Sequence, residues 1–205
     1  MVKITDITNQ KNKNKFNLFV DGEFYSGILK ETAVANNFFV GKEIDENLLA
    51  DILIESETKQ AFEKASNYLA TRLHSKFELR MKLIKKEFSS RAIELALNRL
   101  EDYGYVNDKE FAKAFAAQNS KLSRQMISQK LSSKGVSKDI IAEVVCAADP
   151  ENEFQKALTV AEKYLKGKDK DSVRDKLYIS LARKGFDGQT IKNVINKLYN
   201  TDIDY

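Results

Sequence analysis

Seven lysine and arginine side chains fall within the twenty residues from Arg72 to Arg91. Only Glu78 and Glu87 oppose them, so the segment carries a surplus of five positive charges. Such side chains bind phosphate groups or acidic protein surfaces by electrostatic attraction, and they break no bonds by themselves. A solvated helix face has the same composition, so the sequence leaves both interpretations open.

The basic cluster has a helical period, with four-residue steps on two neighbouring strips of one helix. Its members are Arg72, Lys76, Arg80, Lys82, Lys85, Lys86 and Arg91. We expect the apolar residues between them, Leu79, Leu83 and Ile84, to face the interior.

Residues that could catalyse a reaction or hold a metal are scarce. His74 is the only histidine and Cys146 the only cysteine, so neither a histidine-based metal site nor an internal disulfide is expected. Tyr103 and Tyr105 could stack on nucleic-acid bases, but their place at a turn between helices favours packing. The chain has no glycine-rich phosphate loop and no nucleophile elbow. We therefore expect no enzyme activity and no cofactor.

A threefold repeat of about fifty residues carries these side chains. Leu83, Leu131 and Leu181 occupy the same place in it, at intervals of 48 and 50 residues. Apolar residues stand ten and fourteen positions after each leucine, as on one face of a helix. They are Ile93 and Leu97, Ile141 and Val145, and Ile191 and Ile195.

Capping residues mark where the helices of each repeat begin. The candidates are Ser75, Ser123 and Ser172 before the leucines, and Ser89, Ser137 and Asp187 after them. An acidic residue three positions after Ser75 and after Ser172 gives both serines capping-box spacing. A further helix precedes these two in each repeat, starting at Asn107 in the second and at Asp149-Pro150 in the third.

Glycines predict where the middle helices end. Gly135 and Gly185 suit a left-handed helix stop, which glycine adopts without strain from a Cβ atom. Glu87 stands at this position in the first repeat, so we expect a stop of different construction there. Lys86, Lys134 and Lys184 recur beside these stops, where they could complement the helix dipole or contact a ligand.

Residues 1–58 have a different pattern. Asp21-Gly22 supplies the turn of a β-hairpin between two aromatic, β-branched segments, and residues 2–8 are expected to add a strand. Residues 30–37 predict a short helix, and a longer helical pattern starts at Asp45. These elements predict a small sheet packed by a helix, which we interpret as a cap on the repeats rather than a second binding site.

The expected fold class is therefore mainly α. It consists of three tandem three-helix repeats in an elongated curved array, with a small N-terminal β-hairpin and helix extension. The expected boundaries are 1–58 for the extension and 59–106, 107–148 and 149–205 for the repeats.

Charge differs between these parts. Residues 1–58 contain 6 Lys and Arg and 10 Asp and Glu, whereas residues 59–205 contain 28 and 20, so the net charges are −4 and +8. The chain lacks an apolar run of about 18 residues, and its N-terminus lacks the apolar core of a signal peptide. We expect a cytoplasmic protein without a membrane partner.

The repeat motifs resemble those of the RecX family of recombination regulators. The resemblance spans residues 60–198 and is strongest in the first two repeats. The matching segments read Tyr68-Leu69-x-x-Arg72-x-x-Ser75-Lys76-x-Glu78-Leu79, Gly104-Tyr105-x-Asn107-Asp108-x-x-Phe111-Ala112 and Ile127-x-x-x-Leu131-x-x-Lys134-Gly135-Val136. The hairpin resembles the extension of longer, Gram-positive-type members. Glu87 and the looser third repeat depart from the family pattern.

The resemblance implies three tandem three-helix repeats and a partner, the RecA filament on single-stranded DNA. Such proteins are non-enzymatic; they usually inhibit strand exchange and ATP hydrolysis by RecA or promote filament disassembly. We hypothesise that basic residues make the contact with RecA and DNA. Those of the first repeat are Arg72, Lys76, Arg80, Lys82, Lys85 and Lys86, extended by Lys130, Lys134, Arg183 and Lys184. A monomer is expected.

Two other functions fit the sequence. Three-helix units resemble helix-turn-helix modules, so the protein could bind single- or double-stranded DNA without RecA and without sequence preference. It could also be a helical scaffold for another protein, with an incidental basic face. A net charge of +4 favours dependence on a partner over autonomous DNA binding.

Overall fold

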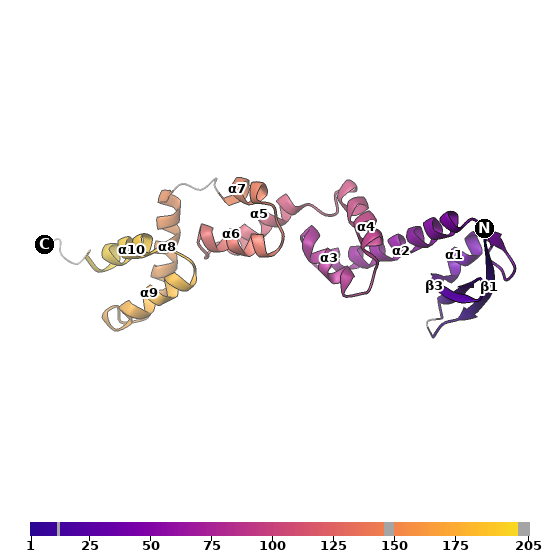
Figure 1. Ribbon diagram of the computed structural model, residues 1–205. Helices are drawn as coiled ribbons and strands as arrows, with labels where there is room; N and C mark the ends of the chain where they lie inside the picture. The colour runs from indigo at the N-terminus through magenta and orange to yellow at the C-terminus, as the bar shows by residue number, and fades with distance from the viewer. Residues whose placement is uncertain (12, 146–149, 201–205) are drawn as a thin grey trace. The chain divides into compact units, whose positions relative to one another are not determined.

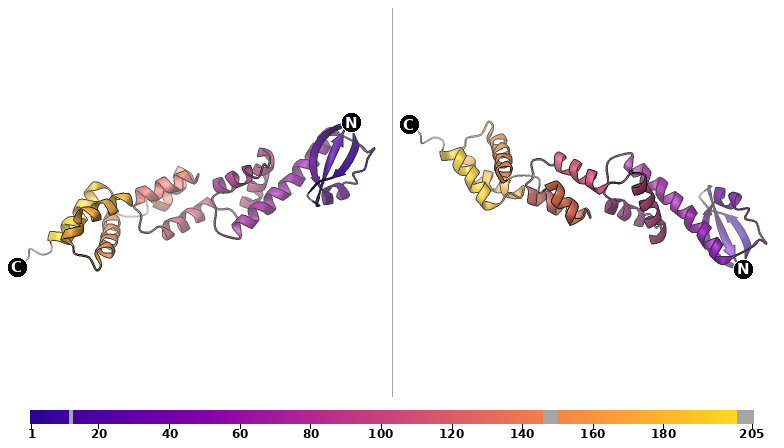
Figure 2. Two further views of the ribbon diagram at one scale, coloured as in Figure 1. Left: turned by 90° about the horizontal axis from the view of Figure 1, so that it is seen from below. Right: turned by 90° about the horizontal axis from the view of Figure 1, so that it is seen from above.

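The computed structural model describes residues 1–11, 13–145 and 150–200 (Figure 1). The N-terminal part is a four-stranded antiparallel sheet in the order β3-β2-β1-β4, with its strands side by side (Figure 2). Its elements are β1 (Val2–Asn9), β2 (Lys15–Val20), β3 (Glu23–Leu29), α1 (Lys30–Ala35) and β4 (Glu43–Ile44). The predicted hairpin, strand and short helix are confirmed, and β4 was not predicted.

The hairpin turn depends on Asp21 and Gly22, both with positive φ, at 50° and 90°. This is the geometry that a two-residue turn between twisted strands requires. The sheet packs its apolar face on the start of the following helix, where Leu49 is fully buried with Ile4 and Leu18.

Nine helices in sets of three make up the repeats within the described residues. The first repeat contains the end of α2 (Glu46–Leu69), then α3 (Lys76–Ile84) and α4 (Ser90–Asp102). The second contains α5 (Asp108–Gln118), α6 (Arg124–Ser133) and α7 (Lys138–Val145). The third contains α8 (Pro150–Leu165), α9 (Arg174–Arg183) and α10 (Gly188–Asn200), with a 3-10 turn, η1 (Asp171–Val173), before α9. The expected mainly α class is confirmed.

Helix α2 belongs to both the extension and the first repeat. It starts at Asp45, whose carboxylate accepts hydrogen bonds from two backbone N–H groups, and it continues without a break through residues 58 and 59. The chain forms two compact units: a first unit of residues 1–72 and 79–105, and a second of residues 73–78 and 106–205.

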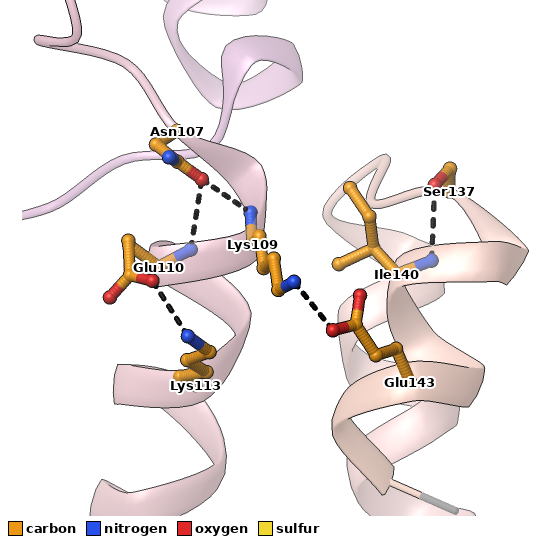
Figure 3. A network of polar contacts seen from close by, with 7 residues as sticks. All are labelled: Asn107, Lys109, Glu110, Lys113, Ser137, Ile140 and Glu143. Carbon is orange, nitrogen blue, oxygen red and sulfur yellow. Dashed lines mark hydrogen bonds and ion pairs between the residues drawn. The ribbon is translucent and has the colours of Figure 1, made fainter.

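The predicted caps are confirmed at all but two positions. Side chains that accept from backbone N–H groups two or three residues later are Ser75, Ser89, Asn107, Ser123, Ser137 and Asp187. Asn107 caps α5 beside the Lys109–Glu143 ion pair that joins α5 to α7 (Figure 3). Asp149 lies outside the described residues, although Pro150 does begin α8.

Ser172 contradicts the prediction. Its hydroxyl donates to the Asp169 carbonyl, and α9 begins two residues later at Arg174 without a side-chain cap. Ser172 lies inside the 3-10 turn, and Val173 occupies the position directly before α9, so the serine is one residue too early to cap this helix.

All three middle helices end in the same left-handed stop. The φ angles are 63° at Glu87, 75° at Gly135 and 83° at Gly185, and each residue donates its N–H to a carbonyl three residues back. The expectation of a different stop at Glu87 is therefore wrong. A glutamate adopts this conformation at a cost that glycine avoids.

The start of α3 docks on the end of α6 inside the second unit. The fully buried Ser75 hydroxyl donates to the Lys134 carbonyl over 2.7 Å while accepting from the Glu78 N–H over 3.1 Å. The next backbone group, the Lys76 N–H, donates to the Asp108 carboxylate over 2.8 Å. One serine thus caps its own helix and holds the end of another.

The start of α6 docks on the end of α9 at the corresponding position, with the backbone N–H of the serine as the donor in place of its hydroxyl. The Ser123 N–H donates to the Lys184 carbonyl over 2.9 Å, and its hydroxyl accepts from the Met126 N–H. The Arg124 N–H donates to the Glu153 carboxylate over 2.9 Å. We call this recurring arrangement the serine–glycine joint: a serine at the start of one middle helix donates to the carbonyl just before the glycine that ends the next, at Lys134-Gly135 for Ser75 and at Lys184-Gly185 for Ser123.

The joint explains which stops need glycine. A Cβ atom at Gly135 would lie 2.3 Å from Phe77, and one at Gly185 would lie 2.7 Å from the Ser123 hydroxyl. Glu87 follows the first middle helix of the chain, so no earlier repeat supplies a serine to pack on it. A glutamate is therefore tolerated at position 87 because no serine of an earlier repeat packs against it, and not because its backbone geometry differs from that of the two glycines.

Candidate functional site

The predicted basic cluster does not lie on one helix, so that part of the prediction is wrong. Lys76, Arg80 and Lys82 lie on α3, whereas Arg72 precedes it, Lys85 and Lys86 follow it, and Arg91 lies on α4. Leu79 and Leu83 are fully buried, as predicted. Ile84 is 49% exposed, so its predicted inward orientation is wrong. Lys85 and Lys86, which follow Ile84 in the turn after α3, are also exposed.

Two of the predicted contact residues already have partners within the first unit. The Arg80 guanidinium donates to the Glu94 carboxylate on α4 over 2.9 Å. The Lys82 ammonium lies 4.3 Å from the centre of the Tyr68 ring on α2, within cation–π range. These contacts connect α3 with its neighbouring helices, so the two charges contribute to the fold before they meet any ligand.

Lys86 belongs to a hollow that we call the first hollow, of about 940 Å³. Three more lysines line it: Lys15 at the start of β2, Lys30 at the start of α1, and Lys64 on α2. Glu31 and Glu63 also line it and offset part of the positive charge. Long-range packing gathers these residues, and no spacing in the sequence could have identified Lys15 and Lys30 as neighbours of Lys86.

The remaining predicted residues differ in exposure. Arg72 is exposed after α2, whereas Lys76 is half-buried in the second unit. Lys130 and Arg183 are exposed near the ends of α6 and α9. The serine–glycine joints fix the backbones of Lys134 and Lys184, but the two side chains differ.

The Lys134 ammonium donates to the Glu78 carboxylate over 2.6 Å and lies within 6.0 Å of the centres of the Phe111 and Phe115 rings. Its charge is therefore used in an ion pair inside the second unit, a contact that the sequence did not predict. Lys184 instead lines a second hollow of about 580 Å³, together with Lys121, Lys156 and Lys163.

Two contacts join α2 to α4 in the first unit: an ion pair, and hydrogen bonds to the serine that caps α4. The Arg99 guanidinium donates two hydrogen bonds to the Glu55 carboxylate, over 3.0 and 2.6 Å. These bonds hold the pKa of Glu55 below its ordinary value. Glu57 accepts from both the N–H and the hydroxyl of Ser89, the cap of α4.

The aromatic residues of the turn after α4 contact one another yet remain open to solvent. The Tyr103 ring meets Phe62 and Tyr105 edge-on, each at a centroid distance of 6.0 Å. Tyr103 and Tyr105 nevertheless stay 65% and 60% exposed. The sequence favoured a packing role for these two tyrosines over base stacking. In the structure, packing covers only part of each ring.

Few residues could catalyse a reaction or bind a metal. His74 is buried, and Cys146 lies outside the described residues. In the described part of the chain, no three His, Cys, Asp or Glu side chains gather as a metal site would require. Over the same residues, no helix has the length and apolar character needed to cross a bilayer.

Comparison with known families gives a consistent result along the chain. A family model described as "Regulatory protein RecX N-terminal domain" matches residues 2–45. Models described as "RecX, first three-helix domain" and "RecX, second three-helix domain" match residues 61–100 and 107–145.

Individual proteins match over nearly the whole chain. "Regulatory protein RecX" of Clostridioides difficile (strain 630) is 35% identical over 206 residues, covering 97% of each chain. The protein of the same name from Bacillus subtilis (strain 168) is 31% identical over 209 residues, covering 98% of this chain and 79% of its own.

Solved structures share the fold. A crystal structure of regulatory protein RecX superposes with a TM-score of 0.61 at 20% identity, covering 95% of this chain and 98% of the other. The crystal structure of RecX from Lactobacillus salivarius gives 0.58 at 24% identity, covering 69% and 96%.

Proposed function

Because the chain belongs to the RecX family of regulatory proteins, we propose that it regulates the recombinase RecA. It binds the RecA filament on single-stranded DNA and inhibits strand exchange and ATP hydrolysis. Family membership along almost the whole chain is the observation that carries this proposal. The protein acts in the cytoplasm as a monomer, without a cofactor and without catalysis of its own.

The contact surface is electropositive and is supplied by the repeats, over residues 59–106, 107–148 and 149–205. The ten basic residues predicted from the sequence remain the proposed set, but their surroundings give them different weight. Lys85 and Lys86 are the strongest candidates, since both are exposed and Lys86 lies among three further lysines. Arg80 and Lys134 are weaker, since each is paired with a carboxylate.

The test is ATP hydrolysis by RecA on single-stranded DNA, with this protein titrated in well below one molecule per RecA. We expect hydrolysis to fall. Lys85→Glu/Lys86→Glu should raise the concentration for half inhibition by about tenfold, because reversed charges repel an acidic partner or phosphate. The matched control is Lys176→Glu/Lys192→Glu, which changes net charge equally at exposed lysines of α9 and α10.

Two results would count against the proposal in different ways. Undiminished hydrolysis with the wild-type protein in excess would reject RecA regulation for this chain. Equal inhibition by both charge-reversed variants and the wild type would leave the function standing but move the contact away from the end of α3.

DNA binding without RecA is the second candidate function. The two lysine-lined hollows favour it, since phosphate contacts need only positive charge and hydrogen-bond donors. Tight binding of DNA by the protein alone, with a steep dependence on salt and no effect on RecA, would identify this function.

A further inference from the structure

The second hollow lies inside the second unit, among the loop before α6 and the helices α8 and α9. Its charged lining consists of Lys121, Lys156, Lys163 and Lys184. Only Lys184 belongs to the basic set predicted from the sequence. The other three form no cluster along the chain.

Helical spacing and one joint bring these side chains together. Lys156 and Lys163 are seven residues apart on α8, two turns along the same face. Ser180 on α9 and Lys184 at its C-terminal cap are four residues apart and share a face. The hydrogen bond from the Ser123 N–H to the Lys184 carbonyl holds the loop that contains Lys121 against the end of α9.

No acidic residue in the described lining of the second hollow balances the positive charge of its lysines. Among the described residues, no aspartate or glutamate lines it, in contrast to the first hollow with Glu31 and Glu63. Glu153 of α8 accepts from the Arg124 N–H elsewhere in the joint. Four ammonium groups around about 580 Å³ repel one another, and an anion between them would remove that repulsion.

Hydroxyl groups extend the lining. Ser120 and Ser180 both face the hollow, whereas the hydroxyl of Thr159 donates to the Gln155 carbonyl on its own helix. Lysine and serine together are typical phosphate ligands. The charged residues of the described lining are all lysines, whose ammonium groups bind phosphate as point charges.

We propose that the second hollow binds phosphate groups of a single-stranded DNA backbone. This inference rests on the proposed function in one respect, the choice of single-stranded DNA as the source of phosphate. It adds a DNA contact in the third repeat that is separate from the end of α3, with Lys121, Lys156 and Lys163 as its main ligands.

The test uses the full chain without RecA. Binding of a fluorescein-labelled oligothymidylate is followed by anisotropy across a series of salt concentrations, for the wild type and two triple variants. Lys121→Gln/Lys156→Gln/Lys163→Gln removes three charges from the hollow. Lys166→Gln/Lys176→Gln/Lys192→Gln removes three exposed charges elsewhere in the second unit and is the matched control. Circular dichroism checks that all three proteins are folded.

We expect the hollow variant to bind at least tenfold more weakly than the control at low salt. The slope of log affinity against log salt should fall by about two, because each phosphate that the variant no longer neutralises on a single strand lowers the slope by about 0.7. If the two variants bind equally tightly, or the wild type does not bind the oligonucleotide, the proposal is wrong.

Further measurements separate the alternatives. Inorganic phosphate is titrated against the wild type by calorimetry. If phosphate binds saturably while the hollow variant still binds the oligonucleotide as the wild type does, the hollow is a site for free anions and the proposal is wrong. A hollow variant that binds DNA normally but no longer inhibits RecA would assign the hollow to an acidic protein surface and overturn it too. If the hollow variant loses DNA binding, the phosphate site is supported even when the wild-type protein has no effect on RecA. The phosphate site and the proposed regulation of RecA can therefore fail independently.

Discussion

At the scale of single residues, the same left-handed backbone conformation occurs beside different neighbouring side chains. Glu87 and Gly185 both end a middle helix with positive φ and the same hydrogen bonds. At Gly185 the Ser123 hydroxyl approaches so closely that any Cβ atom would collide with it, whereas Glu87 has no preceding repeat against it. Glycine at the joint is therefore required by packing as well as by the φ angle.

This reasoning predicts different costs for two glycine substitutions. Gly185→Ala should lower the free energy of unfolding by about 1–2 kcal/mol for left-handed strain and by a further ~1–3 kcal/mol for overpacking against Ser123 and Met126. Gly167→Ala, with φ 75° and nothing within 4 Å of the added atom, should show only the strain. Urea unfolding followed by circular dichroism measures both, and equal losses would refute the packing role of the joint.

At the scale of an element, the first turn of α10 shows how a cap makes a helix sensitive to pH. Asp187 accepts hydrogen bonds from the Thr190 hydroxyl and from the N–H groups of Thr190 and Gln189. These bonds lower the pKa of Asp187, with the Thr190 hydroxyl contributing most. A folded pKa below the unfolded one means that the cap stabilises the protein above the unfolded pKa and loses this effect as pH falls through the folded value.

Asp187→Ala should therefore cost about 1 kcal/mol of unfolding free energy at neutral pH, the usual value of a helix cap. The difference from wild type should shrink as pH falls below the ordinary aspartate pKa of about 4. Asp187→Asn is the control, because its neutral amide oxygen still accepts from the backbone but does not titrate. A difference between wild type and Asp187→Ala that stays constant down to acidic pH would contradict this assignment.

At the scale of the molecule, the N-terminal sheet and the first repeat are parts of the same compact unit. Helix α2 crosses the boundary at residue 58 that the sequence suggested, and it buries Leu49 against the sheet. Its residues Glu55 and Glu57 bind Arg99 and Ser89 on α4. The extension is thus fastened to the repeat through a shared helix rather than placed beside it.

Deleting residues 1–58 should consequently destabilise the first repeat, since it cuts α2 and removes both acidic partners of α4. We expect a lower unfolding temperature for the shortened protein and weaker protection of α4 amides in hydrogen exchange. The Glu55→Gln/Glu57→Gln variant is the matched control, because it removes the two charges and keeps the sheet. An unchanged unfolding temperature after the deletion would show that the repeat folds without the extension.

Much of the fold could be read from the chain because its signals are local. Helix caps, left-handed stops and apolar spacing involve residues within one or two turns, and Ser89, Asn107 and Gly135 behave as their types predict. The leucine repeat located the three sets of helices, since Leu83, Leu131 and Leu181 are all fully buried. Ser172 is not a cap because it lies inside a 3-10 turn and Val173 takes the position before α9.

The sequence by itself determined the repeats, their caps and an excess of positive charge, because each depends on neighbours along the chain. Tertiary structure alone decided which positive charges are available. It paired Arg80 and Lys134 with carboxylates, gathered Lys15 and Lys30 beside Lys86, and placed three unpredicted lysines around Lys184. Electrostatic energy depends on distance in space, and residues far apart in the sequence become neighbours only when the helices pack.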